Sequence, residues 1–91
     1  MNKRAHLYIF GEVIDVGFRA WTVENAQSLG LVGWVRNASG NLVETVFEGK
    51  EKKAEEMIER CHSGPGRARV EKVEVVWEEA TGEFEGFVVR Y

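Results

Sequence analysis

The spacing of apolar residues changes along this chain, and the order of the changes restricts the fold more than any other feature. Segments in which every second residue is apolar are typical of half-buried strands, whereas apolar residues three or four positions apart are typical of amphipathic helices. An alternating segment comes first, a helical one follows, two alternating segments come next, and both patterns then recur. The sequence therefore predicts the order strand, helix, strand, strand, helix, strand, with a short closing strand.

Two helices are predicted from the helical spacing. The first covers residues 18–30, and the residues on its apolar face, at spacings of four, four and three, are Phe18, Thr22, Ala26 and Leu29. The second covers residues 50–62, and its apolar stripe consists of Ala54, Met57, Ile58 and Cys61. Charged residues fill the other sides of the second helix, so its apolar stripe is expected to pack against a sheet.

Five strands are predicted, over residues 5–13, 31–37, 42–49, 68–79 and 83–91. One face of the first strand carries Leu7, Ile9 and Gly11. Its other face carries His6, Tyr8 and Phe10. Turn-forming residues at 38–41 are predicted to join the second and third strands as a hairpin.

This order is the split βαβ, or ferredoxin-like, arrangement of the α+β class, βαββαβ with an added C-terminal strand. Two helices are expected to cover one face of a mostly antiparallel sheet, because both the helices and the strands have one apolar face to bury. A chain of 91 residues has room for one modest core. We therefore expect a single domain over residues 1–91.

Charge and composition limit the expected partners. The formal net charge is −3, which argues against non-specific binding of nucleic acid or of an anionic membrane. No apolar run approaches the length of a membrane span. The opening residues, MNKRAHLYIF, lack the apolar block and cleavage site of a signal peptide, so a cytoplasmic location is expected. We also expect a monomer.

The potential metal ligands are few and scattered. Cys61 is the one cysteine, which excludes an intramolecular disulfide and a cysteine zinc cluster. Its place in the helical stripe predicts a small buried residue rather than a nucleophile. His6 and His62 lie far apart in the sequence and are interpreted as a sheet-face residue and a helix-end residue. No metal or other cofactor is expected.

The segment IDVGFR links the first predicted strand to the first helix and is the main candidate for chemistry. The candidate phosphate-binding loop consists of Ile14, Asp15, Val16, Gly17, Phe18 and Arg19. Backbone N–H groups at a helix start have no partner inside the helix, and with the helix dipole they favour an anion. Gly17 permits a positive φ, and Arg19 can clamp phosphate or carboxylate with two prongs. Taken alone, the pattern also describes an ordinary helix start with a solvated arginine.

Asn37 is the second candidate site residue. It ends the predicted strand 31–37 just before the turn, where an asparagine commonly hydrogen-bonds its own backbone. The alternative is a site role. In this fold we expect strand 31–37 to lie close to the first strand, so that the end of the strand approaches the loop at residues 14–19. A neutral amide there can donate a hydrogen bond to a water or accept one from it.

Several blocks, in order along the chain, resemble the acylphosphatase family. GEVIDVGFR is similar to the family pattern G-x-V-Q-G-V-x-F-R, and LGLVGWVRNASGNLVETVFEG is similar to its G-W-V-x-N followed by a glycine turn. GPGRARVEKVEV and GFVVRY complete a resemblance that runs from about Ala5 to Tyr91. It implies a metal-free hydrolase of small acyl phosphates, yielding a carboxylate and inorganic phosphate. The arginine that ends the family's first motif binds the phosphoryl group together with the loop amides, and the resemblance implies this role for Arg19. The asparagine that closes the second motif orients the attacking water, and the resemblance implies this role for Asn37.

The chain departs from the family pattern inside the loop, where Ile14 and Asp15 replace Gln-Gly. Aspartate tolerates the left-handed region better than most residues, but its carboxylate would repel a bound dianion. Asp15 could point to solvent, pair with Arg19 in competition with phosphate, or abolish the site. We expect the first arrangement, with activity retained and phosphate affinity reduced.

Two alternative functions stay open at this point. The chain could be a non-catalytic relative that binds phosphate or another small anion, weakened by Asp15. It could also be a module for single-stranded RNA, because the sheet face opposite the helices would carry Tyr8, Phe10 and Trp34 for base stacking. Acidic residues expected on that face, Glu44 and Glu74, and the absence of a basic stripe in the sequence argue against RNA.

Overall fold

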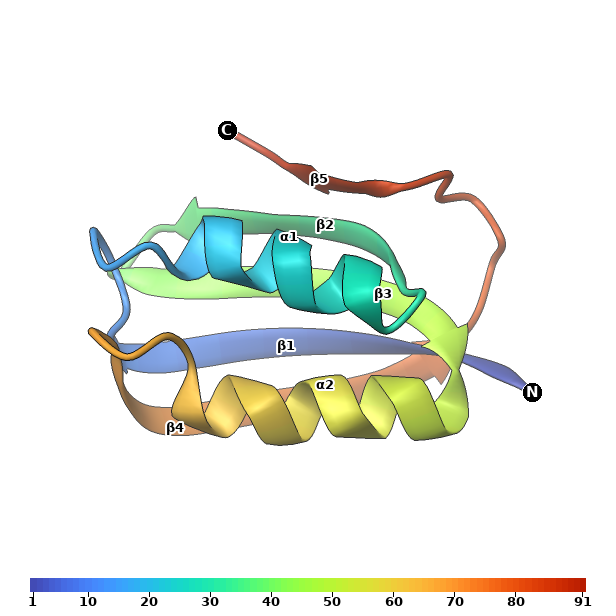
Figure 1. Ribbon diagram of the computed structural model, residues 1–91, viewed down its shortest axis with the longest axis horizontal. Helices are drawn as coiled ribbons and strands as arrows, with labels where there is room; N and C mark the ends of the chain where they lie inside the picture. Colours follow the sequence, from blue (N-terminus) through green and yellow to red (C-terminus); the bar gives the residue numbers. More distant parts are fainter.

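A computed structural model describes the chain from Met1 to Tyr91. Its elements are β1 (Asn2–Glu12), α1 (Phe18–Ser28), β2 (Val32–Ala38), β3 (Leu42–Lys50), α2 (Glu51–Ser63), β4 (Arg69–Glu79) and β5 (Phe87–Val89). Figure 1 shows the two helices lying side by side over one face of a single sheet. The predicted order of elements and the ferredoxin-like α+β class are confirmed.

The sheet has the strand order β4-β1-β3-β2-β5. The pairs β1·β4, β1·β3 and β2·β3 are antiparallel, and β2·β5 is parallel. The expectation that strand 31–37 lies close to the first strand is therefore wrong, because β3 lies between β1 and β2. In the split βαβ unit the helix crosses over a gap one strand wide, and the hairpin partner fills that gap.

The core lies between the sheet and the helices. All four residues predicted on the inner face of α1 are buried, and Ala54, Met57 and Cys61 of α2 are buried as well. From the sheet, the inward residues of β1 and β3 include Leu7, Ile9, Val43 and Phe47. The helical and alternating periods thus place their apolar residues on the faces predicted from the sequence.

Two strand boundaries differ from the prediction. β1 begins at Asn2, earlier than residue 5, because its N-terminal residues pair with the ends of both β3 and β4. β5 is limited to Phe87–Val89 instead of residues 83–91. The segment before β5 is not in the ladder, since the Thr81 and Gly82 N–H groups donate to the side chain of Glu48.

The sheet face opposite the helices carries the aromatic and charged residues predicted there. Tyr8 pairs in register with Glu44 on one side and with Glu74 on the other. Glu44 is buried on this face, and it contacts His6 Nε2 at 2.6 Å and the Arg36 guanidinium at 2.7 Å. These contacts with His6 and Arg36 satisfy the buried Glu44 carboxylate on this face. Neither helix has the length and apolar character needed to cross a membrane.

Candidate active site

The loop between β1 and α1 has an unusual backbone. Asp15 has φ 61° and Gly17 has φ 80°, so both occupy the left-handed region. Gly17 is also the N-cap residue of α1, directly before its first residue Phe18, and no side chain caps this helix end. Glycine adopts this conformation without strain, and aspartate adopts it at a moderate cost. The loop therefore folds back at two points before the helix starts.

The backbone N–H groups of this loop have no acceptor in the protein. The first hydrogen bond of the helix runs from the Trp21 N–H to the Gly17 carbonyl at 3.0 Å. No N–H from Ile14 to Ala20 donates to another protein group. A run of free amides at a helix start carries partial positive charge and suits a tetrahedral oxyanion.

A pocket of about 210 Å³ opens beside this loop. Its lining residues are Val13, Asp15, Gly17, Phe18, Arg19, Ala20, Asn37, Val89 and Tyr91. The structure thus brings Asn37 together with four of the six residues predicted for the loop, Asp15, Gly17, Phe18 and Arg19. Ile14 and Val16 do not line the pocket, because their side chains pack against the hydrophobic core.

Arg19 lies in the first turn of α1 and is half-buried. Its guanidinium carbon is 5.5 Å from the centre of the Tyr91 ring, and no carboxylate forms an ion pair with it. A guanidinium that rests on an aromatic face keeps its N–H donors free at its edges. Arg19 therefore contacts the exposed Tyr91 ring without its charge being neutralised.

Asn37 lies near the end of β2, where its backbone pairs in register with Val43 of β3. Its side-chain amide has no hydrogen-bond partner within the protein. β1 and β2 run in the same direction, since each is antiparallel to β3. The C-terminal ends of both strands consequently lie at the same end of the sheet. This brings Asn37 to the loop although β3 separates the two strands.

No pattern in the sequence points directly to the four other lining residues, Val13, Ala20, Val89 and Tyr91. Val89 and Tyr91 reach the pocket because β5 pairs with β2 in parallel, with Val89 opposite Val35. The sequence predicted a closing strand there, but the alternation of apolar residues does not reveal which strand of the sheet it pairs with. Val13 and Ala20 flank the predicted loop in sequence.

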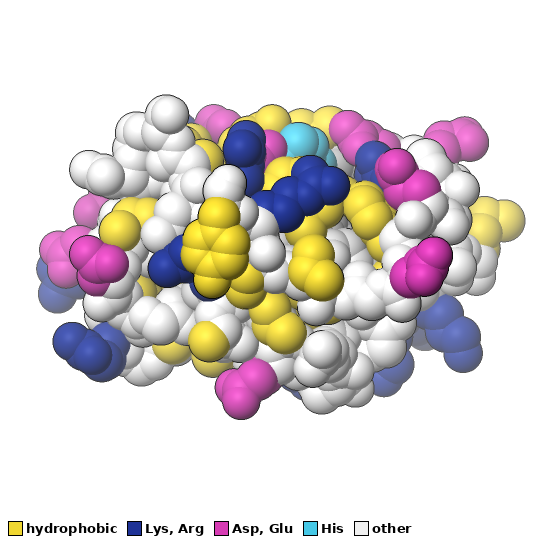
Figure 2. Space-filling view, turned by 90° about the horizontal axis from the view of Figure 1, so that it is seen from above, with side chains coloured by type: hydrophobic (Ala, Val, Ile, Leu, Met, Phe, Trp, Pro, Cys, Tyr) yellow, Lys and Arg dark blue, Asp and Glu magenta, His cyan; other side chains and the backbone are white.

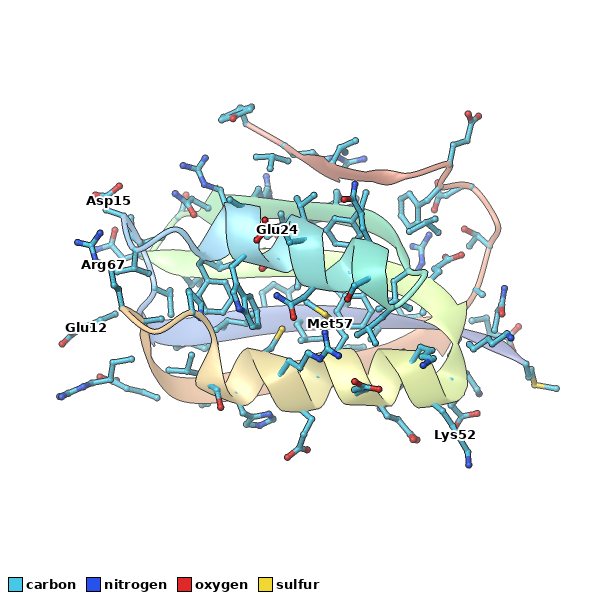
Figure 3. The ribbon with its side chains drawn as sticks, in the orientation of Figure 1. Glu12, Asp15, Glu24, Lys52, Met57 and Arg67 are labelled. Atoms are coloured by element: carbon cyan, nitrogen blue, oxygen red, sulfur yellow. The ribbon has the colours of Figure 1, made fainter.

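Asp15 is exposed at the rim of the pocket. Figure 3 shows it at the tip of the β1–α1 loop, at the outer end of the molecule. No ion pair or hydrogen bond joins its carboxylate to Arg19. The free protein therefore keeps the cation of the pocket unpaired despite the acid nearby.

Several basic side chains lie near one another on the face of the molecule that is seen along β5. Figure 2 looks onto the β5 edge and shows lysine and arginine side chains in the middle of this face, with most acidic groups toward its margins. Arg36 and Arg90 both lie over the Trp34 ring, at 5.7 and 4.6 Å. Arg36 is paired with Glu44, whereas Arg19 and Arg90 form no ion pair and offset the net negative charge locally.

The other potential reactive groups lie apart from this pocket. Cys61 is fully buried in α2, and burial raises the pKa of its thiol to about 12. His62 is exposed on α2, and its ring nitrogen Nδ1 contacts the Ile58 carbonyl at 3.0 Å. No group of three or more His, Cys, Asp or Glu side chains comes together in a metal-binding arrangement.

Comparison with known proteins agrees with this geometry. Residues 5–89 match the family model described as Acylphosphatase. The chain belongs to the acylphosphatase family. It is 48% identical to an acylphosphatase of Roseiflexus sp. (strain RS-1) over 94% of this chain and 92% of that protein. It is also 46% identical to an acylphosphatase of Geobacter sulfurreducens over the full length of both chains.

A solved structure extends the agreement to three dimensions. The crystal structure of acylphosphatase from Bacillus subtilis superposes with a TM-score of 0.94 and 26% identity, and all of both chains is covered. The resemblance drawn from the sequence is thus confirmed. An acylphosphatase enzyme is supported over both alternatives, the non-catalytic anion-binding relative and the RNA-binding module.

Proposed function

We propose that the pocket beside the β1–α1 loop is where this family member hydrolyses small acyl phosphates. The loop amides and Arg19 would bind the phosphoryl group, and Asn37 would orient the attacking water. The observation that carries the proposal is that Arg19 and Asn37 line one pocket with a loop whose N–H groups have no acceptor. The loop with Arg19 and the end of β2 with Asn37 are separate segments of the chain, and they meet only in the folded protein.

The loop and Arg19 supply the charge stabilisation that phosphoryl transfer requires. In the loose transition state, negative charge is spread over the three equatorial oxygens of the phosphoryl group. Backbone N–H groups from residues 14–20 are fixed donors for these oxygens, and the guanidinium adds a two-pronged contact. The contact with the exposed Tyr91 ring would favour the orientation in which Arg19 faces the substrate.

The side-chain amide of Asn37 is suited to positioning a water molecule. The carbonyl oxygen of the amide accepts a hydrogen bond from the water, which leaves a lone pair of the water directed at phosphorus. The new bond joins the water oxygen to phosphorus, and the bond to the acyl oxygen breaks. The electron pair leaves with the carboxylate product, and the water proton passes to solvent or to the phosphate.

The carboxylate leaving group makes modest demands on the protein. A good leaving group needs neither a strong general acid nor a Lewis acid to depart, so we propose catalysis by this chain's own residues without a bound metal ion. The domain 1–91 would act as a monomer, since the proposed groups all come from one chain.

Asp15 is proposed to tune the pocket rather than to abolish it. Its exposed carboxylate lies at the rim and would repel a phosphate dianion through solvent. The backbone N–H of the same residue points to no protein acceptor and stays available for the ligand. We therefore expect turnover with a reduced affinity for phosphate.

The decisive experiment is the hydrolysis of benzoyl phosphate by the purified protein and by the Arg19→Ala and Asn37→Ala variants. Turnover that both substitutions reduce sharply would support the proposal. Binding of inorganic phosphate without any turnover would instead identify a non-catalytic anion-binding protein. Turnover that survives both substitutions would move the active site elsewhere on the molecule.

A further inference from the structure

One wall of the pocket belongs to the shortest strand of the sheet. Val89 of β5 and Tyr91 just after it line the pocket. β5 has three residues and pairs with β2 alone, at the edge of the sheet. Hydrogen bonds of 2.8 Å flank it, from the Gly33 N–H to the Gly86 carbonyl and from the Arg90 N–H to the Val35 carbonyl. A strand this short at an edge is prone to local opening unless something else holds it.

The segment that leads into β5 is held by one buried carboxylate. Glu48 of β3 is 2% exposed. Its Oε2 accepts hydrogen bonds from the Thr81 N–H at 3.0 Å and the Thr81 hydroxyl at 3.1 Å, and its Oε1 accepts one from the Gly82 N–H at 3.0 Å. A charged acceptor that takes two consecutive backbone N–H groups fixes both the position and the direction of that backbone.

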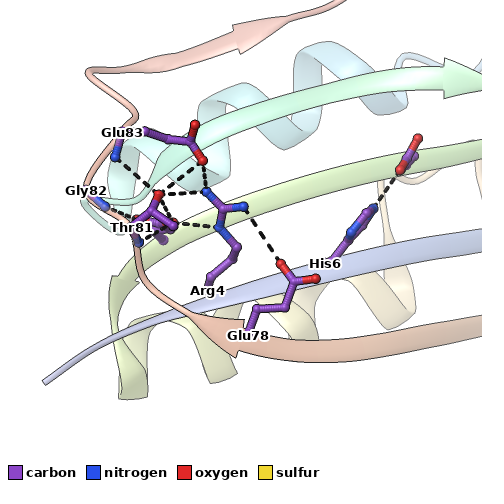
Figure 4. A network of polar contacts seen from close by, with 8 residues as sticks. Arg4, His6, Glu78, Thr81, Gly82 and Glu83 are labelled. Atoms are coloured by element: carbon purple, nitrogen blue, oxygen red, sulfur yellow. Dashed lines mark hydrogen bonds and ion pairs between the residues drawn. The ribbon is translucent and has the colours of Figure 1, made fainter.

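Two more side chains complete this arrangement. Arg4 of β1 donates from Nε to Glu48 at 2.6 Å, and it also contacts Glu78 and Glu83. Figure 4 shows Arg4 at the centre of the network, with Thr81, Gly82 and Glu83 on one side and Glu78 on the other. We call the contacts among Arg4, Glu48, Thr81, Gly82 and Glu83 the Glu48 clamp. Its buried polar atoms all have partners.

The Glu48 clamp lies at one end of β5 and the pocket lies at the other. Figure 1 shows the connection from β4 to β5 at the end of the sheet opposite the β1–α1 loop. Only residues 83–86 separate the clamped Gly82 from the first residue of β5. A connection this short cannot move freely when Gly82 is fixed, so the clamp sets where β5 starts and how it is aligned on β2.

We propose that Glu48 is a positioning residue, which fixes β5 on β2 and through β5 holds the Val89 and Tyr91 wall of the pocket. Tyr91 in turn contacts Arg19, so the clamp influences the phosphate site without touching substrate. The part that concerns the pocket rests on the function proposed above, whereas the part that concerns β5 does not.

The chain offers a matched control for Glu48. Glu44 lies on the same strand and the same sheet face, is 6% exposed, and is paired with His6 and Arg36. It has no contact with residues 80–86. The test therefore compares Glu48→Gln with Glu44→Gln, since both changes replace a buried, paired carboxylate by an amide of the same shape.

Each variant is characterised by two measurements. Amide hydrogen exchange measures the opening of the Arg90 N–H, whose acceptor is the Val35 carbonyl. Steady-state kinetics with benzoyl phosphate give KM and kcat. We expect Glu48→Gln to accelerate exchange of the Arg90 amide about tenfold and to raise KM about threefold, with kcat changed by less than about twofold. Glu44→Gln should change neither the exchange rate nor KM.

A second pair of variants tests the clamp from the loop side and avoids any change in the core. Gly82 and Gly30 both have φ 73°, and an added Cβ at either position would meet nothing within 4 Å. Alanine at either site strains the backbone equally, but only Gly82 gives its N–H to Glu48. Gly82→Ala should reproduce the effects of Glu48→Gln, and Gly30→Ala should not.

The inference would be overturned if the Arg90 amide exchanged at the same rate in Glu48→Gln as in Glu44→Gln. If Glu48→Gln fails to fold, equal exchange in Gly82→Ala and Gly30→Ala overturns it in the same way. Faster exchange with an unchanged KM would refute the link from β5 to the pocket. If the wild-type protein fails to hydrolyse benzoyl phosphate, the proposed function fails, and amide exchange alone still decides whether Glu48 positions β5.

Discussion

The guanidinium of Arg19 lies over the ring of Tyr91, with 5.5 Å between the guanidinium carbon and the ring centre. The contact joins the first turn of α1 to the residues that follow β5, at opposite ends of the sequence. It orients the one cation that lines the pocket and leaves its N–H donors free for a ligand. The geometry of the proposed phosphate site therefore depends on a strand far from the loop in sequence.

Replacing Arg19 by alanine should lower kcat/KM for benzoyl phosphate about 100- to 1,000-fold, because a fixed donor to the transition-state charge is lost. Arg67→Ala is the control for the change in net charge. Arg67 is exposed, lies at the same end of the molecule and does not line the pocket (Figure 3). A similar loss in both variants would show that Arg19 acts only through the general field of the protein.

Removing the Tyr91 ring should weaken substrate binding without stopping the reaction. Tyr91→Ala is expected to raise KM about threefold to fivefold, the value of one exposed cation–π contact. Tyr91→Phe keeps the aromatic face and should retain the wild-type KM. If the phenylalanine variant behaved like the alanine variant, the hydroxyl of Tyr91 rather than its ring would be responsible.

Asn37→Ala should separate the chemical step from binding. We expect kcat to fall roughly 100-fold, because the attacking water is no longer oriented. The dissociation constant for inorganic phosphate, measured by calorimetry, should stay within about twofold, since the phosphate contacts are made by the loop and Arg19. A parallel loss of phosphate affinity would assign Asn37 to phosphate binding instead.

The charge of Asp15 should weaken phosphate binding in a salt-dependent way. Asp15→Asn removes the charge and keeps a residue that tolerates φ 61°. We expect the inhibition constant of inorganic phosphate to fall about fivefold at low salt, and the difference to shrink at high salt as screening increases. Asp15→Gly should give the same result if charge alone is responsible. An unchanged constant in both variants would show that the carboxylate has no influence on the ligand.

Local patterns in the sequence predicted the local parts of the structure. The four residues predicted on the inner face of α1 are all buried, because helical periodicity depends only on neighbouring residues. The hairpin turn was predicted correctly as well, and Gly40 and Asn41 both have the positive φ expected of turn formers. The loop at residues 14–19 could be found because it lies between two strongly periodic segments.

The parts that the sequence left undetermined depend on contacts between distant segments. Asn37 was predicted correctly to lie near the loop, but for a wrong reason, because β3 separates β1 from β2. Asn37 reaches the loop because β1 and β2 run in the same direction, so that both strands finish at the same end of the sheet. The pocket wall at Val89 and Tyr91 depends on the edge at which β5 pairs. Alternation placed Glu44 on the sheet face opposite the helices, yet its burial follows from its pairing with Arg36 and His6.

Glu44 should make the stability of the fold sensitive to acid. Burial alone would raise the pKa of this carboxyl, but hydrogen bonds from His6 and Arg36 outweigh burial and hold the pKa below its ordinary value of 4.5. A carboxyl whose pKa is lower in the folded state binds protons more readily when unfolded, so it stabilises the fold above pH 4.5. That contribution is lost as the pH falls through the folded-state pKa.

Chemical denaturation at several pH values should therefore show wild type more stable than Glu44→Gln at neutral pH, with the two free energies of unfolding converging in acid. A difference that stayed constant down to the acid limit would mean that the charge of Glu44 contributes nothing and that the amide simply packs less well.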